Sequence, residues 1–215
     1  HNQDKEIWDR SAIYQREIRG SVVGIWGYGG IGRETARLVK NMGMKVHVLS
    51  RGGVKPRSNV YRIAGTGDPY GSLADRVFLA HEKEAFLQEL DFLVIAMPQT
   101  SDNEGIIGER ELSLLKPTAF ILNPARGPLI DEQALINALQ NKRIAGAALD
   151  THYYYPMPAA HPLWQLPNVI MTPHISGSSL SPAFLERVWD IFVQNTTRFR
   201  QDEPLLNELD ARELK

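Results

Sequence analysis

Residues 22–32 read VVGIWGYGGIG, an apolar run followed directly by a cluster of glycines. The run at residues 22–26 has the length and the composition of a buried strand. Gly27, Gly29 and Gly32 then spell G-x-G-x-x-G at the opening of a helix, which the spacing of apolar residues between positions 31 and 42 predicts. Gly43 stands where the C-cap of that helix is expected. The stretch therefore predicts one complete strand–helix unit.

The same alternation continues along most of the chain. Short apolar runs predict further strands at residues 46–49, 92–96, 119–122, 144–149 and 169–171. Amphipathic stretches predict helices at residues 82–90, 109–115 and 132–139, the last with Asp131 as its N-cap. Residues 52–74 are rich in glycine, proline, arginine and serine and show no period, so we expect a loop there. Strands and helices that alternate over short connections predict an α/β fold, a doubly wound parallel sheet of the Rossmann type.

The composition of the 215-residue chain is that of an ordinary globular protein, with 43% hydrophobic and 23% charged residues. Basic and acidic residues nearly balance at 24 and 25, which argues against a general nucleic-acid binder or a membrane-surface binder. The sequence has no apolar run of the roughly 18 residues that a membrane span needs and no charged-then-apolar leader, so we expect a cytoplasmic protein. The absence of cysteine excludes disulfides and thiolate chemistry.

The glycine motif has the context that dinucleotide binding requires, because it follows a strand and opens a helix. Gly27 permits the tight turn, Gly29 lets the backbone approach a pyrophosphate, and Gly32 lets the helix pack against the strand. We therefore expect a dinucleotide pyrophosphate at the positive end of the helix, over residues Tyr28, Gly29, Gly30 and Ile31. The alternative is a glycine-rich turn without a ligand.

The residues after the second strand predict the choice of cofactor. A carboxylate there would accept hydrogen bonds from the adenosine ribose and repel a 2′-phosphate. The sequence instead has Ser50 and Arg51, with Lys55 and Arg57 close behind. A hydroxyl and positive charge suit the 2′-phosphate of NADP, so NADP is favoured over NAD. The alternative is a solvated loop with ordinary basic residues.

Three further motifs each follow a predicted strand. They are Asn123-Pro124-Ala125-Arg126-Gly127, Ala147-Ala148-Leu149-Asp150 and Thr172-Pro173-His174-Ile175-Ser176-Gly177. The carboxyl ends of parallel strands form the ligand-binding edge of an open α/β sheet, so a guanidinium, a carboxylate and an imidazole should converge there. We expect no metal, because the histidines and carboxylates show no metal-ligand spacing. His47, His81 and His161 do not lie in a motif of this kind and are interpreted as structural or surface residues.

Together with the glycine motif, these motifs resemble the D-2-hydroxyacid dehydrogenase family over residues 17–189. The resemblance implies hydride transfer between a nicotinamide and C2 of a small 2-hydroxy or 2-oxo acid. It implies that Arg126 binds the substrate carboxylate, that His174 exchanges the hydroxyl proton, and that Asp150 contacts the nicotinamide carboxamide. Beyond the glycine motif, the expected cofactor-binding residues are Ser50, Arg51, Met97, Pro98, Thr100, Pro124, Ala125, Arg126, Asp150, His174, Ser176 and Gly177.

One position departs from the family pattern. The family places a glutamate that pairs with the catalytic histidine where this chain has Tyr155. A neutral phenol can orient an imidazole but cannot stabilise its charged form, so Tyr155 is assigned to the catalytic group in an orienting role. The formate dehydrogenase branch also lacks this glutamate and is the first alternative. The second alternative is a protein that binds dinucleotide to regulate an interaction, as transcriptional corepressors of the family do.

The resemblance also divides the chain. It implies a linking helix in residues 1–19, which we place at 6–19, a dinucleotide-binding domain in 20–178, and a C-terminal helical segment in 179–215 that would pack on a substrate domain. About a hundred residues, an ordinary small-domain size, are expected to precede the linking helix. His1 in place of a methionine agrees with a trimmed chain. The resemblance further implies a homodimer.

Overall fold

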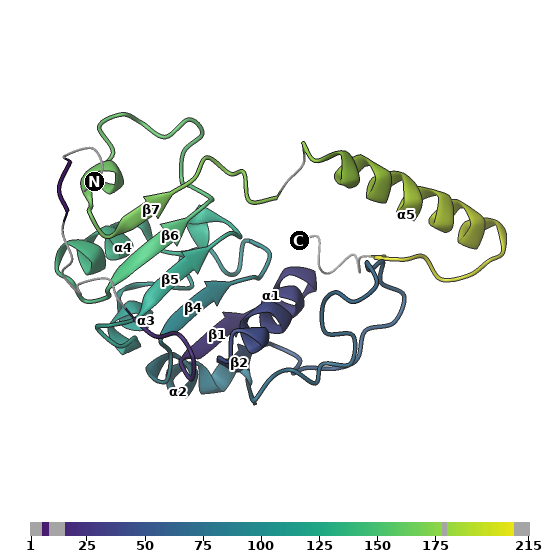
Figure 1. The fold of residues 1–215 in the computed structure, drawn as a ribbon, viewed down its shortest axis with the longest axis horizontal. Helices are drawn as coiled ribbons and strands as arrows, with labels where there is room; N and C mark the ends of the chain where they lie inside the picture. The colour runs from purple at the N-terminus through teal and green to yellow at the C-terminus, as the bar shows by residue number, and fades with distance from the viewer. Residues whose placement is uncertain (1–5, 9–15, 178–179, 209–215) are drawn as a thin grey trace.

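The computed structural model describes residues 6–8, 16–177 and 180–208. At its centre is a seven-stranded parallel sheet with the order β3-β2-β1-β4-β5-β6-β7 (Figure 1). The strands are β1 (Val22–Trp26), β2 (Lys45–Leu49), β3 (Arg76–Phe78), β4 (Phe92–Ile95), β5 (Phe120–Asn123), β6 (Gly146–Leu149) and β7 (Val169–Met171). The strand order reverses between β1 and β4, and open α/β sheets bind ligands at such a switch point.

Helices cover both faces of this sheet. They are α1 (Gly30–Asn41), α2 (Lys83–Gln88), α3 (Glu109–Leu114) and α4 (Glu132–Gln140), and a further helix, α5 (Pro182–Arg200), does not pack on the sheet. Side chains of α2, α3 and α4 join one buried core, and α1 joins a second core with β1, β2 and β4. Val23 and Ile25 of β1 belong to the core of α1, whereas Trp26 belongs to the other core. Burial on both faces explains why the strands read as apolar runs.

The fold class and the doubly wound topology are those that the sequence predicts. Every predicted strand is present, with ends that differ by at most two residues. Gly43 follows the end of α1 with a φ of +78°, in agreement with the expected termination of the helix. The sequence does not predict β3, because Arg76 and Val77 are exposed at the edge of the sheet and leave no apolar run.

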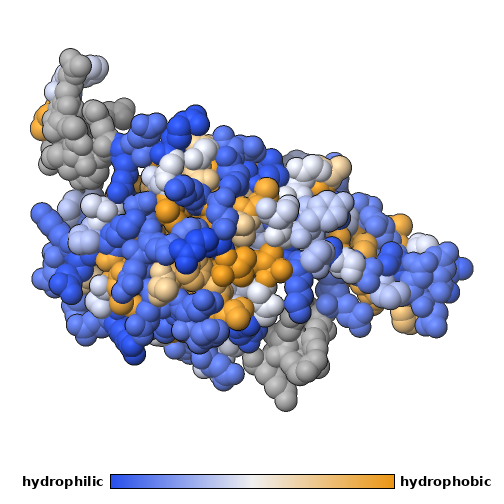
Figure 2. Space-filling model, turned by 90° about the horizontal axis from the view of Figure 1, so that it is seen from below, coloured by the Kyte–Doolittle hydropathy of each residue, from blue (hydrophilic) through white to orange (hydrophobic). Residues whose placement is uncertain are grey.

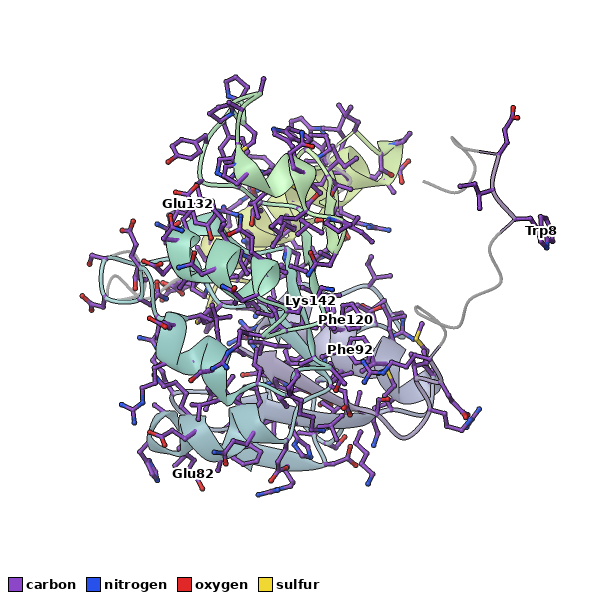
Figure 3. The ribbon with its side chains drawn as sticks, turned by 90° about the vertical axis from the view of Figure 1, so that its left-hand side faces the viewer. Trp8, Glu82, Phe92, Phe120, Glu132 and Lys142 are labelled. Atoms are coloured by element: carbon purple, nitrogen blue, oxygen red, sulfur yellow. The ribbon has the colours of Figure 1, made fainter. Side chains whose placement is uncertain are left out.

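The expected linking helix is not seen in the parts of it that the structure describes. Residues 6–8 and 16–19 form turns or irregular structure, and residues 9–15 lie outside the described residues. The guanidinium of Arg16 lies over the stacked rings of Phe92 and Phe120, at 5.8 and 5.9 Å from their centroids. These two rings are neighbours in Figure 3, where Trp8 stands away from the domain.

Helix α5 also stands apart from the sheet (Figure 1). Its large apolar side chains are mostly exposed, with Trp189 at 64% and Phe192 at 59%. Figure 2 shows apolar side chains at the centre of one face and again at the end of the molecule that α5 forms. Residues 52–74, which contain neither helix nor strand as predicted, contact this helix: the Tyr61 hydroxyl donates to Asp190 at 2.8 Å.

Two glycines of the turn after β1 offer a matched test of the packing of α1. A Cβ on Gly32 would lie 2.3 Å from the carbonyl oxygen of Gly27, whereas a Cβ on Gly29 would have no neighbour within 4 Å among the described atoms. Gly32→Ala should lower the free energy of unfolding by about 1–3 kcal/mol, because the backbone must shift. Gly29→Ala should change it by less than about 1 kcal/mol, the range expected at an N-cap. Urea unfolding followed by circular dichroism measures both values, and equal stability of the two variants would contradict this packing.

Candidate functional site

The glycine turn lies at the carboxyl edge of the sheet, between β1 and α1. Gly27 has a φ of +98°, which favours glycine, and a Cβ there would lie 2.7 Å from the carbonyl oxygen of Ala96. Gly29 is the N-cap of α1 and supplies no side chain to the first N–H groups of the helix. The space beside Gly29 is open, so an anion can approach these N–H groups at the positive end of the helix. This cradle fits the pyrophosphate that the motif predicts.

The two residues expected to select the cofactor follow β2. The hydroxyl of Ser50 donates to the carbonyl oxygen of Gly53 at 3.1 Å, and its amide donates to that of Phe78 at 3.1 Å. Arg51 is exposed. The hydroxyl of Ser50 is therefore engaged within the chain, and Arg51 is the group of the pair that faces solvent.

Met97, Pro98 and Thr100 follow β4, next to the glycine turn. The backbone nitrogen of Met97 would lie only 2.8 Å from a Cβ on Gly27, so the two turns touch. Asn103 fixes the segment, because its side-chain amide donates to the Pro98 carbonyl at 2.8 Å and its side-chain oxygen accepts from the Thr100 N–H at 2.8 Å. Asn103 was not identified from the sequence, and its role depends on the local turn alone.

Arg126 lies in a loop after β5 that the buried side chain of Asn123 shapes. The Oδ1 of Asn123 accepts from the N–H groups of Ala125 and Arg126 at 3.1 and 3.2 Å, and its Nδ2 donates to the Arg126 carbonyl at 2.8 Å. The guanidinium of Arg126 donates to the Ala125 carbonyl at 2.7 Å. A Cβ on Gly127 would lie 2.5 Å from the carbonyl carbon of His152. Asn123 therefore positions Arg126, and Gly127 lets this loop pack against His152.

Asp150 follows β6 and is only 7% exposed. Its carboxylate accepts from the hydroxyls of Thr172 and Ser176, both at 2.6 Å, and from the N–H groups of Ile175 at 2.9 Å and Ser176 at 3.2 Å. Burial raises the pKa of this carboxyl, but the hydroxyl and amide donors outweigh burial and lower the pKa to about 2. These donors occupy the roughly four lone-pair sites of a carboxylate. Asp150 therefore holds residues 172–176, and a carboxamide donor would have to displace one of its present partners.

His174 lies on the loop that Asp150 holds. Its φ is +57°, a left-handed conformation that is uncommon for residues other than glycine. The Oη of Tyr155 lies 3.2 Å from the Nδ1 of His174 and accepts from the His152 N–H at 3.1 Å. Within the described part of the chain, the Nε2 of His174 has no hydrogen-bond partner. The structure thus places Tyr155 against one ring nitrogen of His174.

His152 was not identified from the sequence, yet it joins two of these loops. Its Nε2 lies 2.8 Å from the carbonyl oxygen of Thr172. A carbonyl only accepts, so this nitrogen carries the hydrogen. The backbone N–H of His152 also donates to the hydroxyl oxygen of Tyr155. His152 therefore connects the segment after β6 to the segment after β7.

Two of the residues interpreted as structural have that role. Asp131 caps α4, because its Oδ1 accepts from the Ala134 N–H at 2.7 Å. His161 is buried, with its Nε2 at 2.6 Å from Glu132 and its Nδ1 accepting from the Leu163 N–H at 3.3 Å.

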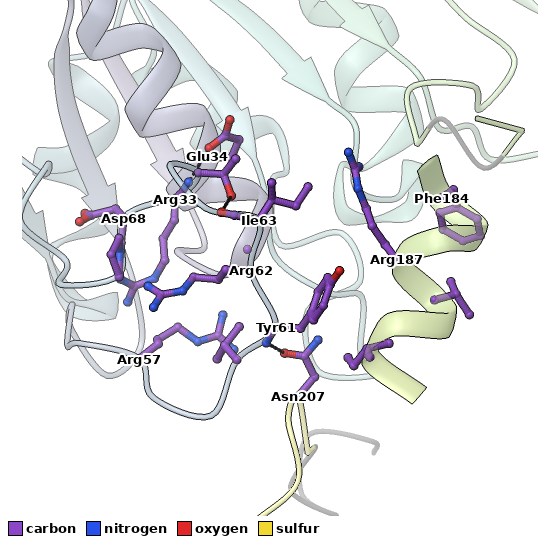
Figure 4. Close-up of a pocket in the computed structure, with 17 residues that line it drawn as sticks. Arg33, Glu34, Arg57, Tyr61, Arg62, Ile63, Asp68, Phe184, Arg187 and Asn207 are labelled. Atoms are coloured by element: carbon purple, nitrogen blue, oxygen red, sulfur yellow. Dashed lines mark hydrogen bonds between the residues drawn. The ribbon is translucent and has the colours of Figure 1, made fainter. Parts of the chain in front are cut away.

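Two cavities lie beside the 52–74 loop. The first, of about 420 Å³, lies between residues 57–69 and α5 and reaches Gly30 (Figure 4). The second, of about 560 Å³, is lined mainly by residues 62–73. Neither is lined by Arg126, Tyr155 or His174. These three side chains are exposed, so they lie on an open edge of the domain.

No group of three or more histidine, aspartate or glutamate side chains that could hold a metal ion occurs among residues 6–8, 16–177 and 180–208. In the same described part of the chain, no helix combines the length and the apolar character that crossing a membrane would require.

The parallel sheet, its switch point and the open glycine turn define a dinucleotide-binding protein of the doubly wound class. The family model described as the NAD binding domain of D-isomer specific 2-hydroxyacid dehydrogenases matches residues 1–176, and the chain belongs to this family. The resemblance seen in the motifs is thereby confirmed. Glyoxylate reductase from Thermococcus gammatolerans is 35% identical over 198 residues, which are 91% of this chain and 53% of that protein.

Solved structures are also similar. The D-isomer specific 2-hydroxyacid dehydrogenase from Xanthobacter autotrophicus Py2, in complex with NADPH and MES, has a TM-score of 0.80 at 28% identity and covers 98% of this chain. The NADPH-dependent glyoxylate/hydroxypyruvate reductase from Sinorhizobium meliloti, in complex with NADP and sulfate, has a TM-score of 0.77 at 26% identity and covers 97%. The chain spans 60% and 61% of these two proteins, and about half the length of the glyoxylate reductases it matches.

Proposed function

We propose that this chain is the cofactor-binding part of an enzyme that transfers a hydride between NADP and C2 of a small 2-hydroxy or 2-oxo acid. The observation that carries the proposal is the loop of residues 172–176, which the buried Asp150 fixes at the carboxyl edge of the sheet with His174 on it. The open glycine turn lies at the same edge, so a bound dinucleotide and a proton-transfer group would meet there. The glyoxylate reductases among its relatives support the substrate class.

The side chains have the chemistry that this reaction needs. When bound, the nicotinamide supplies the hydride acceptor or donor. Arg126 binds the substrate carboxylate through two N–H groups of its guanidinium. The Nε2 of His174 takes the hydroxyl proton as the hydride leaves C2, and returns the proton to the carbonyl oxygen in the reverse direction. Tyr155 keeps the imidazole oriented through Nδ1.

The residues of the glycine motif hold the pyrophosphate, and Arg51 with Ser50 meets the 2′-phosphate. The similar structures that contain NADPH or NADP support the choice of cofactor. From the family we also propose a homodimer. We further propose a cytoplasmic protein, and the balanced charge supports one that binds neither nucleic acid nor membranes.

Turnover by the intact protein that carries this chain tests the proposed reaction. NADPH oxidation is expected with glyoxylate or hydroxypyruvate, and Arg126→Ala should lower kcat/KM by about tenfold or more, because a charge-assisted contact is worth about 1.5–3 kcal/mol. Absorbance at the nicotinamide band measures both. Formate oxidation without turnover of 2-oxo acids would instead favour a formate dehydrogenase. Cofactor binding with no turnover of any of these acids would favour a regulatory protein.

Tyr155 should influence the pH dependence of the reductive reaction. A carboxylate beside an imidazole favours its protonated form, whereas a neutral phenol does not. Protonated His174 is the acid in this direction, so Tyr155→Glu should move the falling limb of the kcat/KM profile to higher pH. Tyr154→Glu is the matched control, because the Tyr154 hydroxyl contacts Glu132 and not His174. An unmoved limb would show that another group serves His174 or that His174 is not the acid.

Arg51 should carry the preference for NADP. Arg51→Asp should weaken NADPH binding by about 1.5–3 kcal/mol, the value of a charge-assisted contact, and should favour NADH. Fluorescence titration of the chain with both cofactors measures the change. Arg143→Asp makes the same charge change at an exposed residue before β6, at the opposite edge of the sheet, and should leave the NADPH to NADH ratio unchanged. Equal NADPH affinity of wild type and Arg51→Asp would contradict this role.

A further inference from the structure

The loop of residues 52–74 begins beside Arg51 and reaches β3 without forming a helix or a strand. Loops of this length without secondary structure are uncommon in compact domains and are usually functional when they are ordered. Lys55 and Arg57 are exposed on the first part of the loop, directly after Arg51, and this part is the basic arm of the loop. An anion site that uses this basic arm needs a contact that fixes the loop.

The buried side chain of Arg33 joins three segments of backbone. It is 6% exposed and lies one turn into α1. Its Nε donates to the carbonyl of Tyr28 at 3.1 Å and its Nη2 to that of Lys55 at 2.6 Å, while its Nη1 donates to the carbonyl of Asp68. The guanidinium also lies over the Tyr28 ring, 4.9 Å from its centroid. Because a guanidinium is a rigid fork of donors, this one side chain connects α1, the glycine turn and both arms of the loop.

A second buried contact connects the same segments. The hydroxyl of Tyr28, the residue between the first two glycines of the motif, donates to Oδ2 of Asp68 at 2.8 Å. Asp68 is 2% exposed and also accepts from the N–H groups of Ser72 and Leu73, both at 3.0 Å. Burial raises the pKa of the Asp68 carboxyl, but the Leu73 amide and the Tyr28 hydroxyl lead the groups that lower it below its ordinary value. The carboxylate is therefore charged at neutral pH.

The two arms of the loop also close on each other. The Arg57 N–H donates to the carbonyl of Pro69 at 3.0 Å. Gly71 has a φ of +74°, and a Cβ on it would lie 2.5 Å from Val54. Figure 4 shows Arg33, Asp68 and Arg57 gathered on one side of the cavity, across from α5. The basic arm is thereby fixed relative to the glycine turn.

We propose that Tyr28, Arg33 and Asp68 form a buried clamp that sets the discrimination between NADP and NAD, by holding the basic arm of the 52–74 loop at a fixed distance from the glycine turn. The inference rests on the proposed function, in which NADP is the cofactor. The three are positioning residues, because their polar side-chain atoms are engaged inside the protein. Both cofactors place a pyrophosphate on α1, but only NADP has a phosphate for the basic arm. Cations that are already ordered bind an anion more tightly, so loosening the clamp weakens NADP more than NAD.

Tyr28→Phe tests the clamp with the loss of one oxygen atom, and it keeps the ring under Arg33. Tyr70→Phe is the matched control, because it removes a hydroxyl from a tyrosine of the same loop that is 76% exposed. Fluorescence titration of the full chain should show NADPH binding weakened about tenfold in Tyr28→Phe, the effect of one lost hydrogen bond to a charged group, and NADH binding weakened less than about threefold. Tyr70→Phe should match the wild type for both cofactors. Asp68→Asn, a second variant that removes the charge, should lower the NADPH to NADH affinity ratio in the same direction.

Melting temperatures separate selectivity from simple stability. A purely structural contact would lower the melting temperature and leave the affinity ratio unchanged, and this result in both Tyr28→Phe and Asp68→Asn would overturn the proposal. A second outcome would overturn the clamp alone. The wild type would prefer NADPH, Arg51→Asp would lose that preference, and both Tyr28→Phe and Asp68→Asn would keep it. The proposal for the clamp would then be wrong, and NADP would remain the proposed cofactor. A wild type without any preference for NADPH would overturn both.

Discussion

Gly32 packs against the carbonyl oxygen of Gly27, and Gly27 packs in turn against the end of β4. Neither position has room for a side chain, so α1 begins close to the switch point of the sheet and directs its first N–H groups toward it. An ordinary N-cap side chain would occupy those N–H groups, and Gly29 has none. The loops that follow β2, β4, β5, β6 and β7 leave the same edge of the parallel sheet as this helix start.

Two buried aspartates hold the loops at that edge, and neither suits acid–base chemistry. Asp68 binds the segment that follows it through the N–H groups of Ser72 and Leu73, and Asp150 binds residues 172–176 through N–H and hydroxyl groups. In both carboxyls the donors outweigh burial and lower the pKa below its ordinary value. A carboxylate that stays charged throughout the neutral range and whose lone pairs are engaged cannot exchange protons with a substrate. This contrast agrees with the proposal that the exposed imidazole of His174, and not either aspartate, carries the proton.

Local patterns in the sequence predicted most of the fold but few of the contacts that hold the loops. Strands buried on both faces read as apolar runs, and the glycine motif is contiguous, so both are visible in the sequence. The pair Tyr28 and Asp68 is 40 residues apart across a loop without periodicity, and no local pattern can join them. Asp150 was identified through the family resemblance and assigned to the cofactor, whereas its contacts in the structure run to residues 172–176. Sequence motifs show which residue types are present at the edge, and tertiary contacts decide which of them are already engaged.

The pairing of His174 with Tyr155 follows from the same backbone contacts. Asp150 binds the N–H groups just after His174, and the chain bends at His174 into a left-handed conformation. The Tyr155 oxygen receives the His152 N–H, which leaves it one lone pair and its own hydrogen. Because Nε2 is the atom that exchanges the proton in the proposed reaction, Nδ1 carries a hydrogen in both protonation states of His174, and the Tyr155 oxygen can accept from it in both. A glutamate could only accept and would favour the protonated state by its charge. In the proposed reaction, tyrosine at this position would orient His174 without favouring either protonation state by its charge.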